Sequence, residues 1–325
     1  MANGVLIAGL ILIFLGAEVT LRGGVGLARQ FDVPPLYTGI FVIAVLTVLP
    51  ELFVTYRAAT LGQAEMALGG IIGTNLLNLT FVMGLGAVIH PMASPPKVLF
   101  RDGGALLAGA LGLVVCALAG AVSRQMGVTL LLAFAIYVGV LVASDWRRAP
   151  DHSVPLARAL FRSGGDMPTV TGAFFLFVLG LIMLALGAHL SVIGGIHLAA
   201  LLGWSETTIG LIPIAAGLSS PKLLVTLMAA VRGQTTIAVG QILGACAFNL
   251  LLVLGLVGLF QPVAVPEQLR HADVFLLAIV SFALLPLLAM RWRLSRPRGV
   301  LLMVAYGCYL GFLLWRQGLP LPWGP

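Results

Sequence analysis

Long stretches of almost continuous apolar residues alternate with short polar or Gly/Pro-rich breaks along the whole chain. Their approximate bounds are 4–22, 36–60, 64–90, 103–122 and 126–145, then 169–190, 205–231, 235–260, 272–290 and 298–316. An α-helix needs about 20 mainly apolar residues to cross the hydrocarbon core of a bilayer. The pattern therefore predicts an all-α polytopic membrane protein with about ten transmembrane helices.

The longest polar stretch of the chain is DWRRAPDHSVPLARALFRSGGD, residues 145–166. It separates the ten apolar stretches into five and five. We therefore expect a first five-helix unit at residues 1–145, a linker at 146–168 and a second five-helix unit at 169–325.

The composition agrees with a protein embedded in lipid. Hydrophobic residues make up 60% of the chain and charged residues 9%, whereas soluble domains carry about 25% charged residues. A water-soluble enzyme is excluded on this ground. The chain has 40 glycines, which is usual where membrane helices pack closely. Cys116, Cys246 and Cys308 lie inside apolar stretches, so we expect them to serve packing.

The basic residues predict how the chain is oriented. With ten helices, successive breaks alternate between the two faces of the membrane, and one face receives Arg57, Arg124, Arg270 and Arg316, whereas thirteen basic residues fall on the other. Cytoplasmic loops are enriched in Lys and Arg, so the linker is predicted to be cytoplasmic and both termini outside. The net charge of +7 thus reflects topology and not nucleic-acid binding. The first apolar stretch lacks the features of a cleaved signal peptide, and a bacterial inner membrane is the expected location.

The two halves of the chain resemble each other at an offset of 171 residues. Gly16-Ala17 then coincides with Gly187-Ala188, and roughly 26 of the 70 pairs between residues 16 and 85 are identical without a gap. Because each half has an odd number of helices, the second copy must enter the membrane from the opposite face. Inverted repeats of this kind are typical of secondary transporters, whose substrate site lies near the middle of the membrane.

Polar residues inside the second helix of each half predict the position of that site. Pro50 and its counterpart Pro221 each remove a backbone donor, so the second and seventh helices are expected to break there. Hydroxyl groups stand beside the prolines, from Thr47 in the first half and from Ser219 and Ser220 in the second. Irregular backbone at membrane depth is tolerated where it lines a cavity.

Glu51 follows Pro50 directly and places a carboxylate near the centre of the bilayer, where ionisable groups mark functional sites. Thr74, Asn78 and Asn249 lie on the helices that come next in each half. Oxygen ligands of this type suit hard cations, so Glu51 and Asn78 are candidate metal ligands. The alternative is a structural cluster of polar residues that joins helices.

These motifs resemble the calcium/cation antiporter superfamily, which includes the sodium/calcium exchangers. The resemblance rests on the LTVLPE (46–51) and GGIIGTNLLN (69–78) segments, their counterparts LSSPK (218–222) and GQILGACAFN (240–249), and GAE at 16–18. It implies alternating access to a mid-membrane cation site formed by both halves. Cation-binding residues in the family correspond to Thr47, Glu51, Thr74, Asn78, Ser219 and Asn249, with Ser220 and Lys222 as modulating neighbours.

The chain departs from the family pattern at several site positions. Lys222 stands where the second glutamate is expected, and Val48 and Ala245 stand where serines are expected. Further departures are Leu46 for a glycine, Leu218 for a threonine, and Gly70 and Gln241 for a residue that is commonly Asn or Asp.

Lys222 determines what the site is expected to bind. Replacing a carboxylate by an ammonium about 5 Å from a divalent ion costs on the order of 13 kcal/mol at an effective dielectric constant near 20. Three outcomes remain open: Lys222 pairs with Glu51 as an internal cation that is displaced or deprotonated during transport, turns away to leave a site for a monovalent ion, or marks a protein that transports no metal.

The expected function is therefore a secondary-active cation antiporter with atypical selectivity, moving Na⁺, Ca²⁺ or H⁺ as substrates. The alternatives are a monovalent cation/proton antiporter and a non-transporting structural or sensor protein. The chain contains no catalytic motif of an intramembrane enzyme and no nucleotide-binding loop. We expect no cofactor, no nucleotide and no nucleic acid as partners, only inorganic cations and lipid. His189, which is aligned with Glu18, is expected to be solvated or structural.

Overall fold

The structure is a computed structural model, and it describes residues 2–31, 44–146, 169–233 and 235–317. Within these ranges nine helical segments are long and apolar enough to cross a bilayer. The protein is an all-α polytopic membrane protein, as the hydropathy pattern predicts. The linker predicted at 146–168 lies outside the described residues except for Trp146, which ends a helix.

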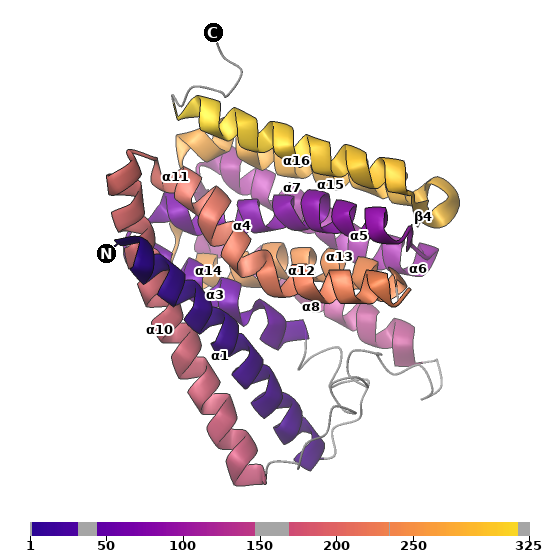
Figure 1. Ribbon diagram of the computed structural model, residues 1–325, viewed down its shortest axis with the longest axis horizontal. Coiled ribbons are helices and arrows are strands. Elements are labelled where there is room, and N and C mark those ends of the chain that lie inside the picture. Colours follow the sequence, from indigo (N-terminus) through magenta and orange to yellow (C-terminus); the bar gives the residue numbers. More distant parts are fainter. Residues whose placement is uncertain (1, 32–43, 147–168, 234, 318–325) are drawn as a thin grey trace.

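Figure 1 shows the helices of the first half, from α1 to α8. They are α1 (Ala2–Gln30), α3 (Ala44–Thr60), α4 (Ala64–Leu77), the π-helical turn η2 (Asn78–Val82), α5 (Met83–Ile89), α6 (Pro96–Val98), the π-helical turn η3 (Leu99–Gly103), α7 (Gly104–Ala119) and α8 (Arg124–Trp146). Two-residue strands β1 (Met92–Ala93) and β2 (Ala121–Val122) lie in the connections.

The second half repeats this order. It contains α10 (Val170–Leu202), α11 (Glu206–Ile209), the π-helical turn η5 (Gly210–Ile214), α12 (Ala215–Val231), α13 (Thr235–Phe248), the π-helical turn η6 (Asn249–Val253), α14 (Leu254–Phe260), the π-helical turn η7 (Leu269–Asp273), α15 (Val274–Ala289), the 3₁₀ turn η8 (Met290–Trp292) and α16 (Arg296–Arg316). Strands β3 (Val263–Ala264) and β4 (Arg293–Leu294) lie in its connections.

Several elements recur at the offset found in the sequence. The bounds of α3, α4, η2, α5 and β1 plus 171 are those of α12, α13, η6, α14 and β3. The short strands also join the two halves at opposite ends of the bundle, because β1 pairs with β4 and β2 pairs with β3, both antiparallel.

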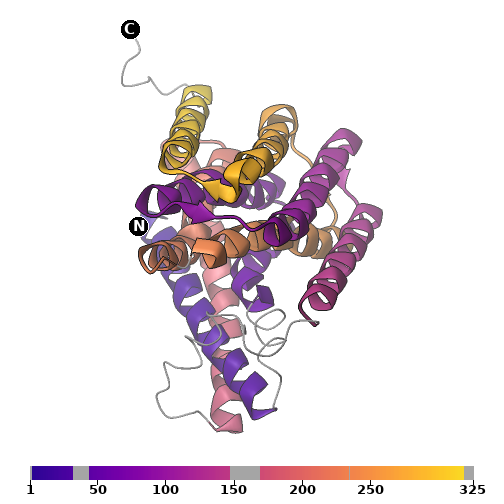
Figure 2. The same ribbon diagram turned by 90° about the vertical axis from the view of Figure 1, so that its right-hand side faces the viewer.

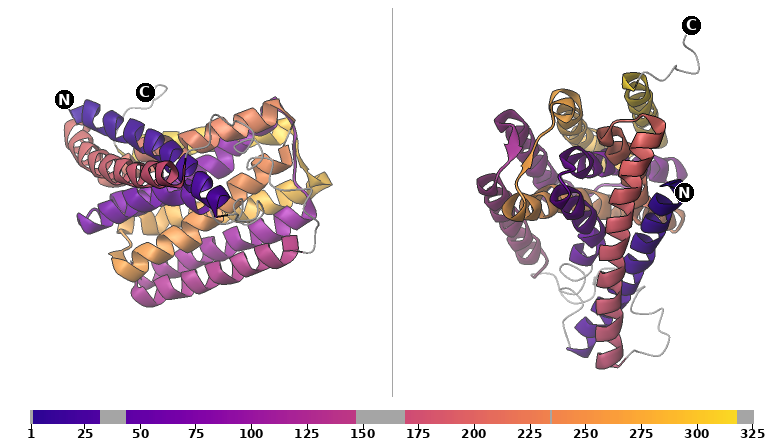
Figure 3. Two further views of the ribbon diagram at one scale, coloured as in Figure 1. Left: turned by 90° about the horizontal axis from the view of Figure 1, so that it is seen from below. Right: turned by 90° about the vertical axis from the view of Figure 1, so that its left-hand side faces the viewer.

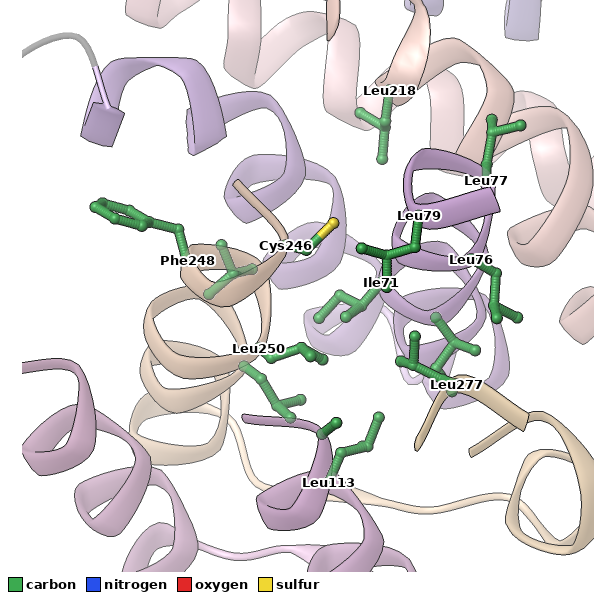
Figure 4. Close-up of a cluster of buried hydrophobic side chains, with 14 of the residues drawn as sticks. Ile71, Leu76, Leu77, Leu79, Leu113, Leu218, Cys246, Phe248, Leu250 and Leu277 are labelled. Carbon is green, nitrogen blue, oxygen red and sulfur yellow. The ribbon is translucent and has the colours of Figure 1, made fainter. Parts of the chain in front are cut away.

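The core of the bundle lies around the third helix of each half. The most apolar windows of Ala64–Ile89 and Ala238–Phe260 are 83% and 78% buried, against 22% for Arg124–Ala143 and for Val170–Leu202. Figure 4 shows the apolar side chains packed between these central helices, among them Ile71, Leu79 and Leu250. Residues on these two helices are therefore shielded from lipid on almost every side.

Helices α1 and α10 form an antiparallel pair that is steeply inclined to α4, α5, α7 and α16 (Figures 1 and 3). The two backbones touch at glycines, since a Cβ on Gly23 would lie 2.3 Å from the Phe177 nitrogen and one on Gly194 2.4 Å from the Leu6 nitrogen. The contacts recur at every seventh residue in both helices, at Gly9, Gly16 and Gly23 and at Gly180, Gly187 and Gly194. Small residues allow this close approach in membranes.

Both inclined helices are longer than the hydropathy pattern predicts, which placed them at 4–22 and 169–190. Arg22 does not end α1, because its Nε lies 2.7 Å from the carboxylate of Glu18 one turn earlier. Ser191 does not end α10, because it is buried where the backbones cross, against Gly9. A tilted helix needs more residues than an upright one to cross the same thickness.

The predicted breaks at Pro50 and Pro221 are wrong. Helix α3 continues through Pro50 and α12 through Pro221. A proline deprives the carbonyl four residues earlier of its donor, and for Pro221 this carbonyl belongs to Gly217. The Ser220 hydroxyl donates a hydrogen bond of 2.7 Å to that oxygen. The side chain thus replaces the missing backbone donor, and the irregular turn η5 lies at 210–214, before the proline.

Candidate functional site

A buried ion pair joins the two halves at the centre of the bundle. Lys222 on α12 donates through Nζ to Oε1 of Glu51 on α3. The side chains are 5% and 1% exposed. Each residue directly follows the proline of its helix. Of the three outcomes that the sequence leaves open for Lys222, the pairing contradicts the one in which the lysine turns away. It fits both an internal cation and a protein that transports no metal.

Helices α3 and α12 and the helices that contact them carry buried polar atoms that make no hydrogen bond within the described residues. Glu51 contributes its second oxygen, Oε2, which the lysine leaves unbonded. The others that were predicted as site atoms are Thr74 Oγ1, Asn78 Oδ1 and Nδ2, Ser219 Oγ, and Asn249 Oδ1 and Nδ2. Buried polar groups are normally hydrogen-bonded, so such a set needs an explanation.

The two asparagines occupy equivalent positions in the fold. Asn78 is the first residue of η2 and Asn249 the first residue of η6, and both are fully buried. A π-helical turn widens the helix by one residue per turn and is often found at functional sites. In each central helix the regular α-helical part ends at the residue before the asparagine.

Close contact between the halves brings these helices together. A Cβ on Gly73 would lie 2.5 Å from the carbonyl oxygen of Leu211, and one on Gly210 would lie 2.8 Å from that of Met66. The glycines therefore let α4 pack directly against η5, the turn that leads into α12 and Lys222. A larger residue at either position would push apart the two helices that carry Thr74 and Ser219.

The remaining predicted residues differ from this set. Thr47 is partly buried on α3, one turn before Glu51. The hydroxyl of Ser220 is bound to the carbonyl of Gly217, so it supports the helix beside the pair. His189 accepts hydrogen bonds of 3.1 Å from Arg57, and Glu18 pairs with Arg22. Neither group joins the buried set, in line with the structural role expected for His189.

Cys246 belongs to this region, although the sequence pattern assigned it to packing alone. It is fully buried on α13, close to Lys222 and Asn78. Figure 4 shows its sulfur pointing from α13 toward the helix that carries Ile71 and Leu79. The repeat could have indicated this position. At the 171-residue offset Cys246 corresponds to Asn75, which lies between the candidate residues Thr74 and Asn78.

Further buried oxygens without a hydrogen bond were not predicted as ligands. Thr226 Oγ1 lies one turn after Lys222, and Gln241 Oε1 and Asn75 Oδ1 lie on the two central helices. In the described residues no group of three or more His, Cys, Asp and Glu side chains gathers as a metal site would require. The structure therefore shows one carboxylate and one ammonium in contact, with unpaired neutral oxygens on the neighbouring helices.

Comparison with known proteins identifies the family. The sequence pattern described as "Sodium/calcium exchanger protein" matches residues 1–143 and 172–315. The chain belongs to this family. Membership confirms the resemblance to the calcium/cation antiporter superfamily and indicates an ion exchanger.

Several relatives align with almost the whole length of this chain. The inner membrane protein YrbG of Escherichia coli is 32% identical over 330 residues, which are 97% of each chain. The sodium/calcium exchanger MaX1 of Methanosarcina acetivorans is 27% identical over 345 residues, covering 96% of this chain and 98% of the relative. The protein is thus a multi-pass membrane protein with a relative named for a bacterial inner membrane.

Solved structures have the same fold. The sodium/calcium exchanger NCX_Mj superposes with a TM-score of 0.60 at 27% identity, covering 95% of this chain and 97% of that one. The H⁺/Ca²⁺ exchanger CAX superposes with a TM-score of 0.78 and covers 95% and 81%; at 17% identity this likeness concerns the fold alone.

Proposed function

We propose that this protein is a secondary-active cation antiporter whose mid-membrane site accepts a monovalent cation in preference to Ca²⁺. The observation that carries the proposal is the buried pair of Lys222 and Glu51. The pair has no net charge, and the structure describes no second carboxylate beside it. Family membership supports transport by antiport, and the ion pair supports the altered selectivity.

The charge of Lys222 opposes a divalent ion more than a monovalent one. At about 5 Å and an effective dielectric constant near 20, a single positive charge is repelled by about 3 kcal/mol and a double charge by about 7 kcal/mol. The remaining attraction comes from Glu51 and from neutral oxygens. Neutral oxygens compensate a single charge more readily than a double one, which makes Na⁺ the expected cargo.

In the proposed cycle Lys222 is an internal cation. With no ion bound, its ammonium neutralises Glu51 and keeps the buried carboxylate from standing alone. An arriving cation takes its place at Glu51, with Asn78, Asn249, Thr74 and Ser219 supplying further oxygens. No nucleotide-binding motif accompanies the site, so ion gradients drive the exchange.

Two alternatives keep the same site and differ in its use. In a monovalent cation/proton antiporter, displacement of Lys222 is accompanied by release of its proton. In a non-transporting member, the pair is a permanent link between α3 and α12. The second is favoured by one observation, that the pair links α3 in one half directly to α12 in the other.

Uptake of ²²Na⁺ into proteoliposomes tests the proposal. Wild-type protein should accelerate exchange of ²²Na⁺ against unlabelled Na⁺, and Glu51→Gln should reduce the rate to that of protein-free vesicles. Glu267→Gln is the matched control, since that side chain is 89% exposed, and it should retain wild-type exchange. Equal rates for wild type and Glu51→Gln would contradict an antiporter working through this site and favour the non-transporting alternative.

We also propose how the chain is oriented in the membrane. With the linker cytoplasmic and both termini outside, a cysteine introduced for Ser153 should react with a membrane-impermeant maleimide only after the inner membrane is permeabilised. Labelling of intact cells from the periplasm would reverse the assignment of the two faces.

A further inference from the structure

The connection between α15 and α16 is a turn with an uncommon backbone. Arg291 has φ 63° and ψ 16°, and the next residue, Trp292, has φ 51°. These left-handed conformations are rare for residues other than glycine, and they persist only where the surrounding structure enforces them. Two in succession therefore indicate a turn that is held in one arrangement.

Contacts from both halves hold this turn. Ser94 donates its N–H to the carbonyl of Trp292 at 2.9 Å and its hydroxyl to that of Leu288 at 2.7 Å. Arg298 donates through Nη1 to the carbonyls of Met290 and Arg293, at 3.0 and 3.2 Å. The pairing of β1 with β4 adds a further link. The side chains on the turn are therefore presented in fixed positions.

Several basic residues belong to α6, to the end of α12, and to the connection between α15 and α16 with the first turn of α16. They are Lys97, Arg232, Arg291, Arg293, Arg296 and Arg298. Figure 1 shows α6 and β4 at the same end of the bundle, which faces the viewer in Figure 2. Arg296 and Arg298 are bound to backbone carbonyls, whereas Arg291 and Arg293 are exposed and form no ion pair within the described residues. A carboxylate at this end, Asp102, is buried and paired with Arg101, so it does not neutralise the surface.

Two aromatic rings lie beside these arginines. Phe100 and Trp292 meet edge to face with their ring centroids 6.1 Å apart, and they are 73% and 40% exposed. The rings come from different halves of the chain, and Met290 next to them is also exposed. Aromatic side chains with one apolar side and one wet side are typical of the level of the lipid headgroups.

We propose that this turn is a binding site for an anionic phospholipid of the surrounding leaflet. Arg291 and Arg293 bind the lipid phosphate, while Phe100 and Trp292 lie against the glycerol and the upper part of the acyl chains. Basic clusters at the cytoplasmic ends of transmembrane helices attract anionic lipids. Topology alone requires only positive charge in this loop and does not require a strained turn fixed by Ser94. The proposal is independent of the transported ion.

Native mass spectrometry of the purified full chain tests this site. Phosphatidylglycerol or phosphatidylcholine is titrated against the wild type, against Arg291→Gln/Arg293→Gln, and against Arg124→Gln/Arg270→Gln as a control at the opposite end. We expect the wild type and the control to retain phosphatidylglycerol at least fivefold better than phosphatidylcholine, and the first double variant to lose this preference. Equal retention by all three proteins would overturn the proposal, as would competition by inorganic phosphate alone.

A second measurement uses the protein without changes to the arginines. In vesicles, dibrominated phosphatidylglycerol should quench tryptophan fluorescence more than dibrominated phosphatidylcholine, and Trp292→Phe should remove the difference. Equal quenching by the two lipids, or a difference that survives Trp292→Phe, would exclude the lipid from this turn.

Discussion

Lys222 is bonded to the residue that occupies its own position in the other half of the chain, Glu51. The two are 171 residues apart, which is also the offset between the repeats. Counterparts that touch must lie on the axis relating the halves. A carboxylate at both positions would place two like charges face to face, which is unfavourable unless a cation lies between them. In this chain an ammonium faces Glu51 directly, so the two opposite charges form a neutral pair.

Removal of the carboxylate should cost stability as well as transport. Glu51→Gln leaves Lys222 buried without its counter-charge, and breaking a buried pair in this way costs about 3–5 kcal/mol. We expect a clear fall in the thermal unfolding midpoint in detergent. The double variant Glu51→Gln/Lys222→Gln should recover most of the stability but none of the flux, and an unchanged midpoint in the single variant would show that Lys222 finds other partners.

Reversal of the lysine charge should create a divalent site. Lys222→Glu puts two carboxylates on the repeat axis, and we expect it to unfold at a lower temperature than the wild type in the presence of chelator. Saturating Ca²⁺ at about 100 times its dissociation constant should then stabilise it by about 2.7 kcal/mol. Wild-type protein measured in the same Ca²⁺ is the control and should show no shift. A Ca²⁺ shift of equal size in both proteins would contradict the role given to Lys222.

The glycine positions where α1 and α10 touch should not tolerate a larger residue. Gly23→Ala places a Cβ 2.3 Å from the Phe177 nitrogen, so α1 and α10 must separate. Overpacking of this kind costs about 1–3 kcal/mol. Gly139→Ala is the control, because nothing lies within 4 Å of its Cβ position. Equal unfolding midpoints for the two variants would mean that the helices are not packed backbone to backbone.

Each half also carries a buried aspartate held by a tyrosine. Tyr309 donates a hydrogen bond of 2.8 Å to Asp273, and Tyr137 one of 2.9 Å to Asp102. Tyr309→Phe removes a donor from a buried carboxylate, which costs about 1–3 kcal/mol. The unfolding midpoint should fall, whereas Tyr56→Phe at an exposed position should leave it unchanged. If Tyr309→Phe is equally neutral, Arg316, which lies 3.0 Å from Asp273, holds the carboxylate alone.

Much of the fold could be predicted because a helix that crosses lipid must consist mainly of apolar residues. Apolar stretches gave the helices, and the 171-residue similarity gave the correspondence of α3 with α12 and of α4 with α13. The ends of α1 and α10 could not be predicted in this way. Arg22 pairs within its own helix and Ser191 is buried by a neighbouring helix, and both effects depend on packing that hydropathy does not contain.

The residues of the site could also be predicted in part, whereas their contacts could not. Motifs and symmetry pointed to Glu51, Asn78 and Asn249, and the structure gives them unbonded buried atoms. That Lys222 reaches Glu51 required the three-dimensional arrangement of α3 and α12. The predicted break at Pro221 was wrong because the sequence shows only that proline removes a backbone donor. The structure shows that the hydroxyl of Ser220 replaces this donor, and that hydrogen bond depends on the local geometry of α12.

The most direct test of the central claim is Na⁺-gradient-driven ⁴⁵Ca²⁺ uptake into proteoliposomes, comparing wild type with Lys222→Glu. Because the ammonium of Lys222 neutralises Glu51 in the wild type, we expect Ca²⁺ uptake only with Lys222→Glu. Ca²⁺ uptake by the wild type at a comparable rate would show that a charged Lys222 does not occupy the cation site, and would contradict the account.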